Sequence, residues 1–262
     1  MRPRGVAGPE IMLRSILAYL VLTQVKWLSR FFWRFRGEWI GIPPDGHWEK
    51  VRLLVILNHT SLYEPILAGY APDALLWRFA RHGVLPVAEK TMRRKIGLFF
   101  SFLARHVVVV TRQRDHTWDN VLNKIDHEAL IMLLPEGRMM RKDGLDSEGR
   151  PMTIRGGVAD VLAAVDVGQM IIVYSGGLHH VQAPGELVPR PARQVRARIE
   201  LVDIPQYRDE LGGADDIAAF RKAVIEDLTI RRDELCPVKE NGGIRGGEVP
   251  RYRFPASAKR GA

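Results

Sequence analysis

The chain has 262 residues, of which 46% are hydrophobic, so it can bury a substantial core in one large domain. Lysine and arginine outnumber aspartate and glutamate by 39 to 30. The resulting net charge of +9 favours an anionic partner: a phosphorylated substrate, an anionic membrane surface or a nucleic acid. Cys236 is the only cysteine, which excludes a disulfide framework or a cysteine-based metal site within one chain and fits a reducing compartment.

Residues 1–10 are predicted to be a disordered basic lead, and residues 11–36 an amphipathic helix lying in a membrane surface. The uncharged run Ser15–Val25 is shorter than the ~20 residues that a spanning helix needs, and no small-residue cleavage site follows it. The alternative is a helix that packs on its own domain. The expected apolar stripe is Leu17, Val21, Val25, Leu28 and Phe32, and the expected polar stripe is Thr23, Lys26, Arg30 and Arg34.

Short apolar runs then alternate with helical patterns, which predicts an α/β domain over residues 37–235. Strands are expected near residues 38–41, at 53–57, 85–88, 106–112, 130–134, 170–174 and 196–203. Helices are expected at 92–103, 118–128 and 158–165, and from Asp215 or Asp216 onward. Residues 236–262 are glycine-rich and basic, so we expect a flexible tail.

The chemistry is concentrated in the octapeptide Asn58–Pro65, NHTSLYEP, directly after the buried run Leu53–Leu57. A histidine at the end of a buried strand lies where α/β folds place ligands. Glu64, five residues later, is expected on the histidine's side of the helix that it opens. Its carboxylate can accept the imidazole N–H, fix the tautomer and raise the basicity of His59. The other interpretation is a strand-end histidine that only caps a helix.

Two later strands also end in polar residues. The run from His106 ends on Arg112, which could grip a phosphate with two hydrogen bonds or could be an ordinary exposed arginine. The run Leu130–Leu134 leads into Pro135-Glu136-Gly137, which could also be a plain turn. We expect the strand before His59 to lie beside the strands that end at Arg112 and Pro135, so that three loops meet.

The pattern Asn58-His59-x-Ser61-x-x-Glu64 resembles the first sequence block of the glycerolipid acyltransferases, the lysophosphatidate acyltransferase superfamily. The family's usual block is His-x4-Asp; glutamate here keeps the carboxylate and is one methylene longer. Three further blocks follow in the family's order, although none is perfect. They are Arg112 after its strand, with His106 in the place of a glycine; Pro135-Glu136-Gly137; and Arg155-Gly156, followed by a strand with Ile172 in the place of a proline.

The third block departs most from the family. Arg138, Met139 and Met140 stand where threonine, arginine and serine are usual, so the guanidinium is supplied either by Arg138 or by Arg141. The resemblance implies a mixed central sheet flanked by helices, with an N-terminal amphipathic membrane helix. It implies His59 and Glu64 as the catalytic pair. The implied substrate-binding residues are Asn58, Ser61, Arg112, Glu136, Gly137, Arg138, Arg141 and Arg155.

The implied activity is O-acyl transfer from a thioester to the hydroxyl of a lysophospholipid, with 1-acylglycerol-3-phosphate as the expected acceptor. The donor is acyl-CoA or acyl carrier protein, used as a co-substrate, with no bound cofactor and no metal. The adjacent pair His179-His180 lacks the i, i+4 spacing of a helix-borne metal pair. The expected location is the cytoplasmic face of a membrane, against an anionic surface.

Two alternatives stay within the same fold: a different lysolipid acceptor, or a catalytically weak membrane lipid-binding protein. Nucleic-acid binding would use the positive charge, but no recognisable motif supports it. A serine hydrolase based on Ser61 is disfavoured, because no Gly-x-Ser-x-Gly elbow is present.

Overall fold

The computed structural model describes residues 9–41, 46–111, 115–184, 186 and 188–237. Within them, seven strands form one sheet in the order β1-β7-β6-β2-β5-β3-β4. All neighbouring strands are parallel except β6 and β7, so the predicted mixed α/β sheet is confirmed. The strands are β1 (Arg34–Ile40), β2 (Val51–Leu57), β3 (Gly83–Ala88), β4 (His106–Val110), β5 (Leu130–Leu133), β6 (Gln169–Ser175) and β7 (Gln194–Asp203).

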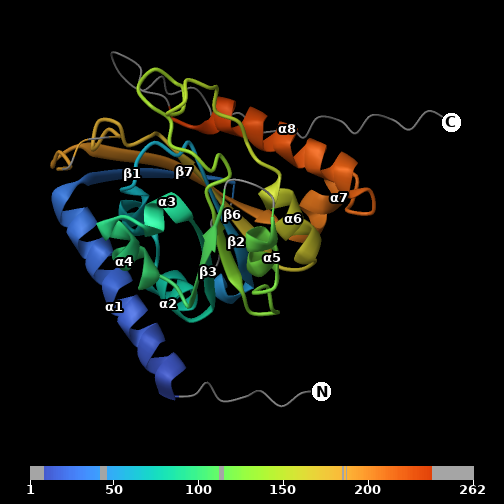
Figure 1. Cartoon of the computed structure of the whole chain (residues 1–262), viewed down its shortest axis with the longest axis horizontal. Helices are drawn as coiled ribbons and strands as arrows, with labels where there is room; N and C mark the ends of the chain where they lie inside the picture. Colours follow the sequence, from blue (N-terminus) through green and yellow to red (C-terminus); the bar gives the residue numbers. More distant parts are fainter. Residues whose placement is uncertain (1–8, 42–45, 112–114, 185, 187, 238–262) are drawn as a thin grey trace.

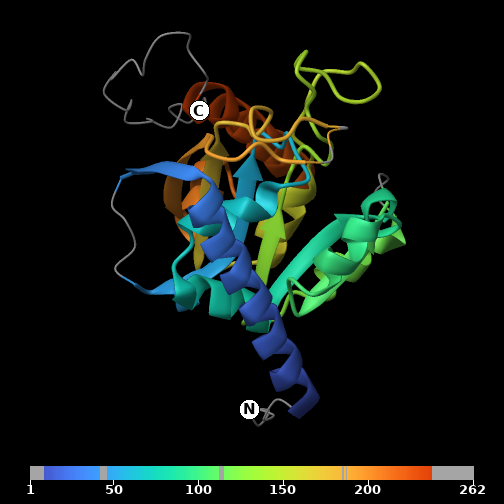
Figure 2. The same cartoon turned by 90° about the vertical axis from the view of Figure 1, so that its left-hand side faces the viewer.

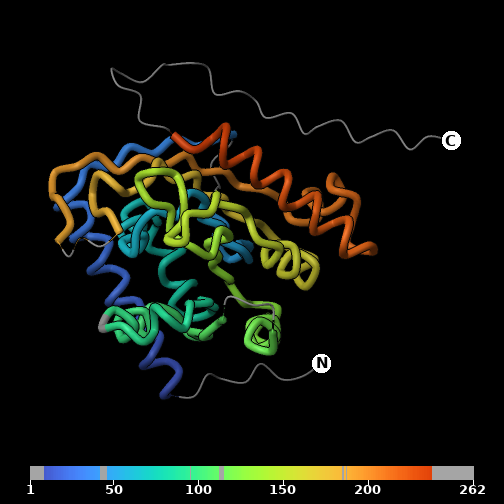
Figure 3. The backbone as a smooth tube through the Cα atoms, turned by 45° about the horizontal axis from the view of Figure 1, so that its top comes forward, coloured from blue at the N-terminus to red at the C-terminus, as the bar shows by residue number. Residues whose placement is uncertain are grey.

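Helices cover both faces of this sheet (Figure 1). On one face lie α1 (Pro9–Phe32), the 3₁₀ helix η2 (Glu64–Tyr70), α2 (Asp73–His82) and α4 (Lys95–Ser101). On the other lie α5 (His116–Leu122), α6 (Gly157–Ala164), α7 (Ile204–Glu210) and α8 (Ile217–Leu235). The tube in Figure 3 shows α1 and α8 on opposite sides of the sheet. The short helices η1 (Trp48–Lys50) and α3 (Glu89–Met92) precede β2 and follow β3.

Strand β2 lies at the centre, and its sequence shows why. Leu53, Val55 and Leu57 pack into the core under α6 and α8, while Leu54 and Ile56 pack toward α1 and α2. A strand covered on both faces needs an unbroken apolar run, which is what residues 53–57 supply. The strand therefore holds His59 at a fixed place, just beyond the carboxyl end of the sheet.

The sheet opens between β5 and β3. Their pairing involves only Gly83 with Leu130 and Val84 with Ile131, whereas β3 pairs with β4 from Val84 to Ala88. Beyond Val84, β3 therefore diverges from β5, while β4 stays paired with β3. Figure 2 shows the resulting unit of β3, α3, α4 and β4, in green, standing away from the rest of the sheet.

Several sequence-based expectations need correction. The strand that leads to Arg112 is β4 at the sheet edge, and β5 and β3 separate it from β2; the neighbours of β2 are β5 and β6. The single helix expected at 92–103 is divided into α3 and α4, and the helix expected at 118–128 is the shorter α5. Helices α2 and α7 were not predicted. Arg112, most of the proposed lead and nearly all of the tail lie outside the described residues.

The orientation of α1 also differs from the expected pattern. Apart from Leu22, the buried residues on its protein-facing side are small or polar, and the Nζ of buried Lys26 lies 2.6 Å from Asp73 Oδ1. Arg30 Nε donates to the carbonyl of Gly69 over 2.9 Å. The exposed side is apolar, and Phe31 has 82% of its surface exposed. Lys26 and Arg30 of the expected polar stripe thus bind the domain, while the apolar side faces outward. The helix expected to reach residue 36 ends at Phe32, and Arg34 begins β1.

The exposed apolar side of α1 is consistent with membrane association. At 24 residues, α1 is also long and apolar enough to cross a membrane by length and composition, which the short uncharged run did not suggest. Yet α1 lies against η2 and α2 along its second half, which favours contact with a membrane from the domain's surface. The exposed side includes Leu13, Leu17, Leu20, Trp27, Leu28 and Phe31.

Candidate active site

The site begins with a sharp turn at Asn58, immediately after β2. Asn58 has φ of 68°, a left-handed conformation that asparagine tolerates better than most residues. Its backbone N–H donates to Glu136 Oε1 over 2.7 Å, and its side-chain Nδ2 donates to the carbonyl of Ser175 over 2.8 Å. These bonds tie the end of β2 to the loops after β5 and β6.

Two further bonds hold the backbone of His59 and the side chain of Thr60. The backbone carbonyl of His59 accepts from the N–H of Met140 over 2.8 Å, and Thr60 Oγ1 accepts from the N–H of Leu178 over 2.7 Å. Figure 2 shows the loop after β5, in yellow-green, and the loop after β6, in gold, gathered at the end of the sheet toward which β2 points. The three loops that meet are therefore those after β2, β5 and β6.

Glu64 is the partner of His59. Its Oε1 lies 3.0 Å from His59 Nδ1, although the alignment is poorer than that of a regular hydrogen bond. The same oxygen accepts from the backbone N–H groups of Thr60 and Ser61, each over 2.9 Å. The octapeptide folds back so that the carboxylate caps its own loop. Pairing through Nδ1 leaves Nε2, on the other side of the ring, as the nitrogen that can take a proton.

The electrostatics of the site come from two buried carboxylates. Burial alone would lower the pKa of His59, but the charges of Glu64 and Glu136 outweigh it and raise that pKa. Burial raises the pKa of Glu136, and the N–H of Asn58 offsets this only in part. Oε2 of Glu64 and Oε2 of Glu136 are buried without a hydrogen-bond partner among the described residues. Each of these oxygens therefore keeps an unused acceptor position.

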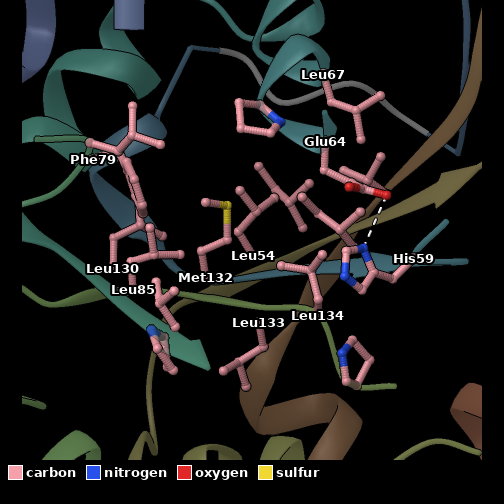
Figure 4. A pocket seen from close by; sticks show the side chains of 18 of the residues that line it. Leu54, His59, Glu64, Leu67, Phe79, Leu85, Leu130, Met132, Leu133 and Leu134 are labelled. Atoms are coloured by element: carbon pink, nitrogen blue, oxygen red, sulfur yellow. Dashed lines mark ion pairs between the residues drawn. The ribbon is translucent and has the colours of Figure 1, made fainter. Parts of the chain in front are cut away.

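An apolar cavity of about 640 Å³ reaches His59 from the α1 and α2 side of the sheet. Its walls come from the strands, from α2 and, through the opening between β3 and β5, from α5 and α6 on the other face, which contribute Trp118 and Val158. Figure 4 shows Glu64 and His59 at one end and aliphatic side chains along the rest. The wall includes Leu54, Phe79, Leu85, Leu130, Met132 and Leu134. We call this the apolar cavity.

A second cavity, of about 900 Å³, touches His59 from the loops after β5 and β6. Its lining mixes apolar and polar residues, its charged residues are mostly basic, and it reaches α8. We call it the basic cavity. The charged side chains that line it are Lys142, Arg190, Arg193, Arg232, Glu136 and Asp233. His59 is thus placed between an apolar space and a cationic one.

The predicted site residues divide between these cavities. Ser61, Glu64, Gly137 and Arg155 line the apolar cavity, and Asn58 and Glu136 line the basic one. Ser61 is fully buried, and its hydroxyl donates to Gln182 Oε1. This hydroxyl therefore makes a structural contact within the protein. Binding roles for these residues stay predictions.

Gly137 and Arg155 lie side by side, because the N–H of Arg155 donates to the carbonyl of Pro135 over 2.9 Å. Gly137 has φ of +61°, and a Cβ there would lie 3.2 Å from the side chain of Arg155. Glycine therefore suits both the turn and the close approach of the arginine.

Arg138 and Arg141 line neither cavity. Arg138 is paired with the buried carboxylate of Asp146, which also accepts from the backbone N–H groups of Glu148 and Arg150. Burial would raise the pKa of Asp146, but these bonds and the guanidinium groups of Arg138 and Arg150 hold that pKa well below its usual range. Arg138 therefore stabilises the loop after β5. Phosphate binding by Arg138 or Arg141 stays a prediction, and Arg112 lies outside the described residues.

Three contributors to the site were missed by sequence reasoning. Gln182 holds Ser61, Asp146 holds Arg138, and Arg193 lines the basic cavity. The repeated aspartates and glycines after Arg141 are a turn signal that could have indicated Asp146. Nothing local marks Gln182, which lies 121 residues from its partner.

No protein-family model and no curated protein matches this sequence. The structure is similar to the crystal structure of the 1-acyl-sn-glycerophosphate (LPA) acyltransferase PlsC from Thermotoga maritima, with a TM-score of 0.52. The two share 17% sequence identity over 87% of this chain and 88% of that chain. At this identity the similarity establishes a shared fold, including an α/β sheet flanked by helices.

Proposed function

We propose that this protein is an acyltransferase that moves a fatty acyl group from a thioester to the hydroxyl of a lysophospholipid. The observation that carries the proposal is the His59–Glu64 pair, 3.0 Å apart, at the end of an apolar cavity. A base beside a long apolar space suits a reaction in which a chain must be held while a hydroxyl is activated. The fold shared with an LPA acyltransferase supports the same proposal.

In the proposed reaction, Nε2 of His59 takes the proton of the acceptor hydroxyl. The oxygen attacks the thioester carbonyl, the carbon–sulfur bond breaks, and the imidazolium returns its proton to the leaving thiolate. Glu64 holds the ring through Nδ1 and stabilises the imidazolium, as its effect on the pKa of His59 indicates. Its own position is fixed by the N–H groups of Thr60 and Ser61.

The apolar cavity would hold an acyl chain, with the reacting carbonyl at His59. The opening between β3 and β5 lets this cavity reach both faces of the sheet, because Leu85 and Met132 line it on the α2 face and Val158 of α6 lines it on the other. The outward apolar side of α1 would keep the protein at the membrane from which a lysolipid is drawn.

For the acyl acceptor, we propose 1-acylglycerol-3-phosphate, following the sequence resemblance. A different lysolipid is the second candidate, and the occupation of Arg138 by Asp146 favours it, because that guanidinium is not free for a phosphate.

The test is to incubate the full-length protein and its His59→Ala variant with a panel of lysolipids and labelled acyl thioesters. We expect a diacyl product with the wild-type protein only. The identity of the acceptor follows from which lysolipid is consumed. Equal product from His59→Ala would refute the role of the base, and no product from any acceptor would refute the activity.

A further inference from the structure

The proposed reaction leaves the basic cavity without a ligand. This cavity meets the apolar cavity at His59, and its cationic lining residues are not the arginines of the motif-based phosphate assignment. A reaction between two substrates needs space for both at the base. The apolar cavity suits a hydrocarbon chain, which leaves the basic cavity for a polar part.

We propose that the basic cavity binds the phosphoester part of one of the two substrates, with Lys142 and Arg193 as its main cationic contacts. This inference rests on the proposed acyl transfer for the identity of the substrates. It differs from the motif-based assignment, which places the phosphate at Arg112 with Arg138 or Arg141.

The charges in the cavity support an anionic ligand. Arg190 is paired with Glu186, and Arg232 Nε lies 2.8 Å from Asp233 Oδ1. Lys142 and Arg193, in contrast, are exposed and make no side-chain hydrogen bond or ion pair within the described part of the chain. They can therefore turn toward an incoming phosphate without breaking an existing contact.

A second observation concerns hydrogen-bond donors on the ligand. Glu136 is 2% exposed, and its buried Oε2 has no hydrogen-bond partner among the described residues. Its other oxygen is held by the N–H of Asn58, so the orphan oxygen is fixed in place. A buried, unpaired acceptor is costly unless a ligand satisfies it.

The ligand class that fits carries a phosphate ester and, close to it, a hydroxyl or amide N–H. The charge would lie at Lys142 and Arg193, and the donor at Glu136. Two substrate parts have this chemistry: the phosphopantetheine arm of a thioester donor and the glycerophosphate head of a lysolipid acceptor. The charge pattern of the cavity suits both, so the experiment must separate them.

The experiment titrates coenzyme A and, separately, sn-glycerol 3-phosphate into the full-length wild-type protein by calorimetry. The same titrations use Arg193→Ala, the double variant Lys142→Ala/Arg193→Ala, and Lys222→Ala as the matched control. Lys222 is an exposed cation on α8 that lines neither cavity.

We expect one probe to bind the wild-type protein and the Lys222→Ala control equally, and to bind about tenfold more weakly to Arg193→Ala. The double variant should bind about a hundredfold more weakly, and salt should weaken binding to the wild-type protein. If the affected probe is coenzyme A, the cavity takes the donor; if it is glycerol 3-phosphate, the cavity takes the acceptor. No binding of either probe, or equal binding in all variants, overturns the inference.

Steady-state kinetics separate this inference from the proposed activity. Turnover by the wild-type protein with unchanged KM values in the double variant would leave the activity standing and overturn the inference. Charge-dependent probe binding in a protein that transfers no acyl group would do the reverse. The binding measurement needs no turnover, so the two results are independent.

Discussion

The loops after β2 and β5 each place a basic side chain beside a buried carboxylate, with different consequences. In the first, Glu64 lies 3.0 Å from His59, whose other ring nitrogen is left at the meeting point of two cavities. In the second, Asp146 pairs with Arg138, and the pair lines neither cavity. A buried carboxylate can therefore orient a basic side chain for reaction, or it can hold that side chain in a purely structural ion pair. The position of the pair relative to a cavity decides between the two.

The largest expected effect is the loss of the base. His59→Ala should lower kcat/KM for acyl transfer by about 10²–10⁴-fold, the usual contribution of a positioned acid–base group. The thermal midpoint should change little, because Glu64 stays bound to the N–H groups of Thr60 and Ser61 and so keeps the loop in shape. The matched control is His47→Ala, an exposed histidine beside Glu49, which should keep wild-type kinetics. Wild-type turnover in His59→Ala would contradict the proposed mechanism.

Glu64→Gln should have the next largest effect. The amide oxygen can still accept from the N–H groups of Thr60 and Ser61, so the loop should keep its shape. The neutral amide cannot stabilise the imidazolium, and we expect kcat to fall by about tenfold to a hundredfold. Glu89→Gln, which changes an exposed carboxylate paired with Arg93, is the control and should be silent.

The pH profile of the same variants gives a more specific readout. His59 must be neutral to accept a proton, and the charges of Glu64 and Glu136 raise its pKa despite burial. Wild-type kcat/KM should therefore fall as the pH drops through that raised pKa. Removing the charge of Glu64 lowers the pKa of His59, so the acidic limb of Glu64→Gln should move to lower pH. An unmoved limb would show that another group controls it.

The second loop should respond in stability more than in turnover. Asp146→Asn and Arg138→Ala each remove one half of the same ion pair, so each should lower the thermal midpoint and speed proteolysis between residues 138 and 151. The double variant should lose less than the sum of the two, because both changes break one shared contact. Additive losses would contradict the pairing. A rise of the acceptor KM in Arg138→Ala alone would instead support a substrate contact for this arginine.

The same contrast explains what sequence reasoning could reach. The strand end at His59 and the carboxylate at Glu64 are five residues apart, so local pattern was enough to identify the pair. The commitment of Arg138 depends on a turn that brings Asp146 back, and the burial of Ser61 depends on Gln182, 121 residues away. The order of the sheet is likewise a long-range property, and for this reason β4 was wrongly expected beside β2, although β5 was correctly expected there. Apolar runs reveal strands, but they do not say which strands pair.

Helix α1 is a third case in which an ion-pair partner determines the role of a basic side chain. Substitution of that side chain should have the smallest effect of those considered. Lys26 belongs to the polar stripe of the expected membrane helix, yet it is buried against Asp73, so Lys26→Ala should change binding to anionic vesicles by less than about twofold. Trp27 and Phe31 are exposed, and the double change Trp27→Ala/Phe31→Ala should weaken binding by about tenfold or more, because it removes apolar surface that lipid would bury. Sedimentation with vesicles at low and high salt measures both effects.

Salt should reduce binding only modestly if the apolar side dominates, since screening acts on exposed charges. Loss of binding in Lys26→Ala, with wild-type binding in the aromatic variant, would show that the helix contacts lipid through its basic side and must leave the domain to do so.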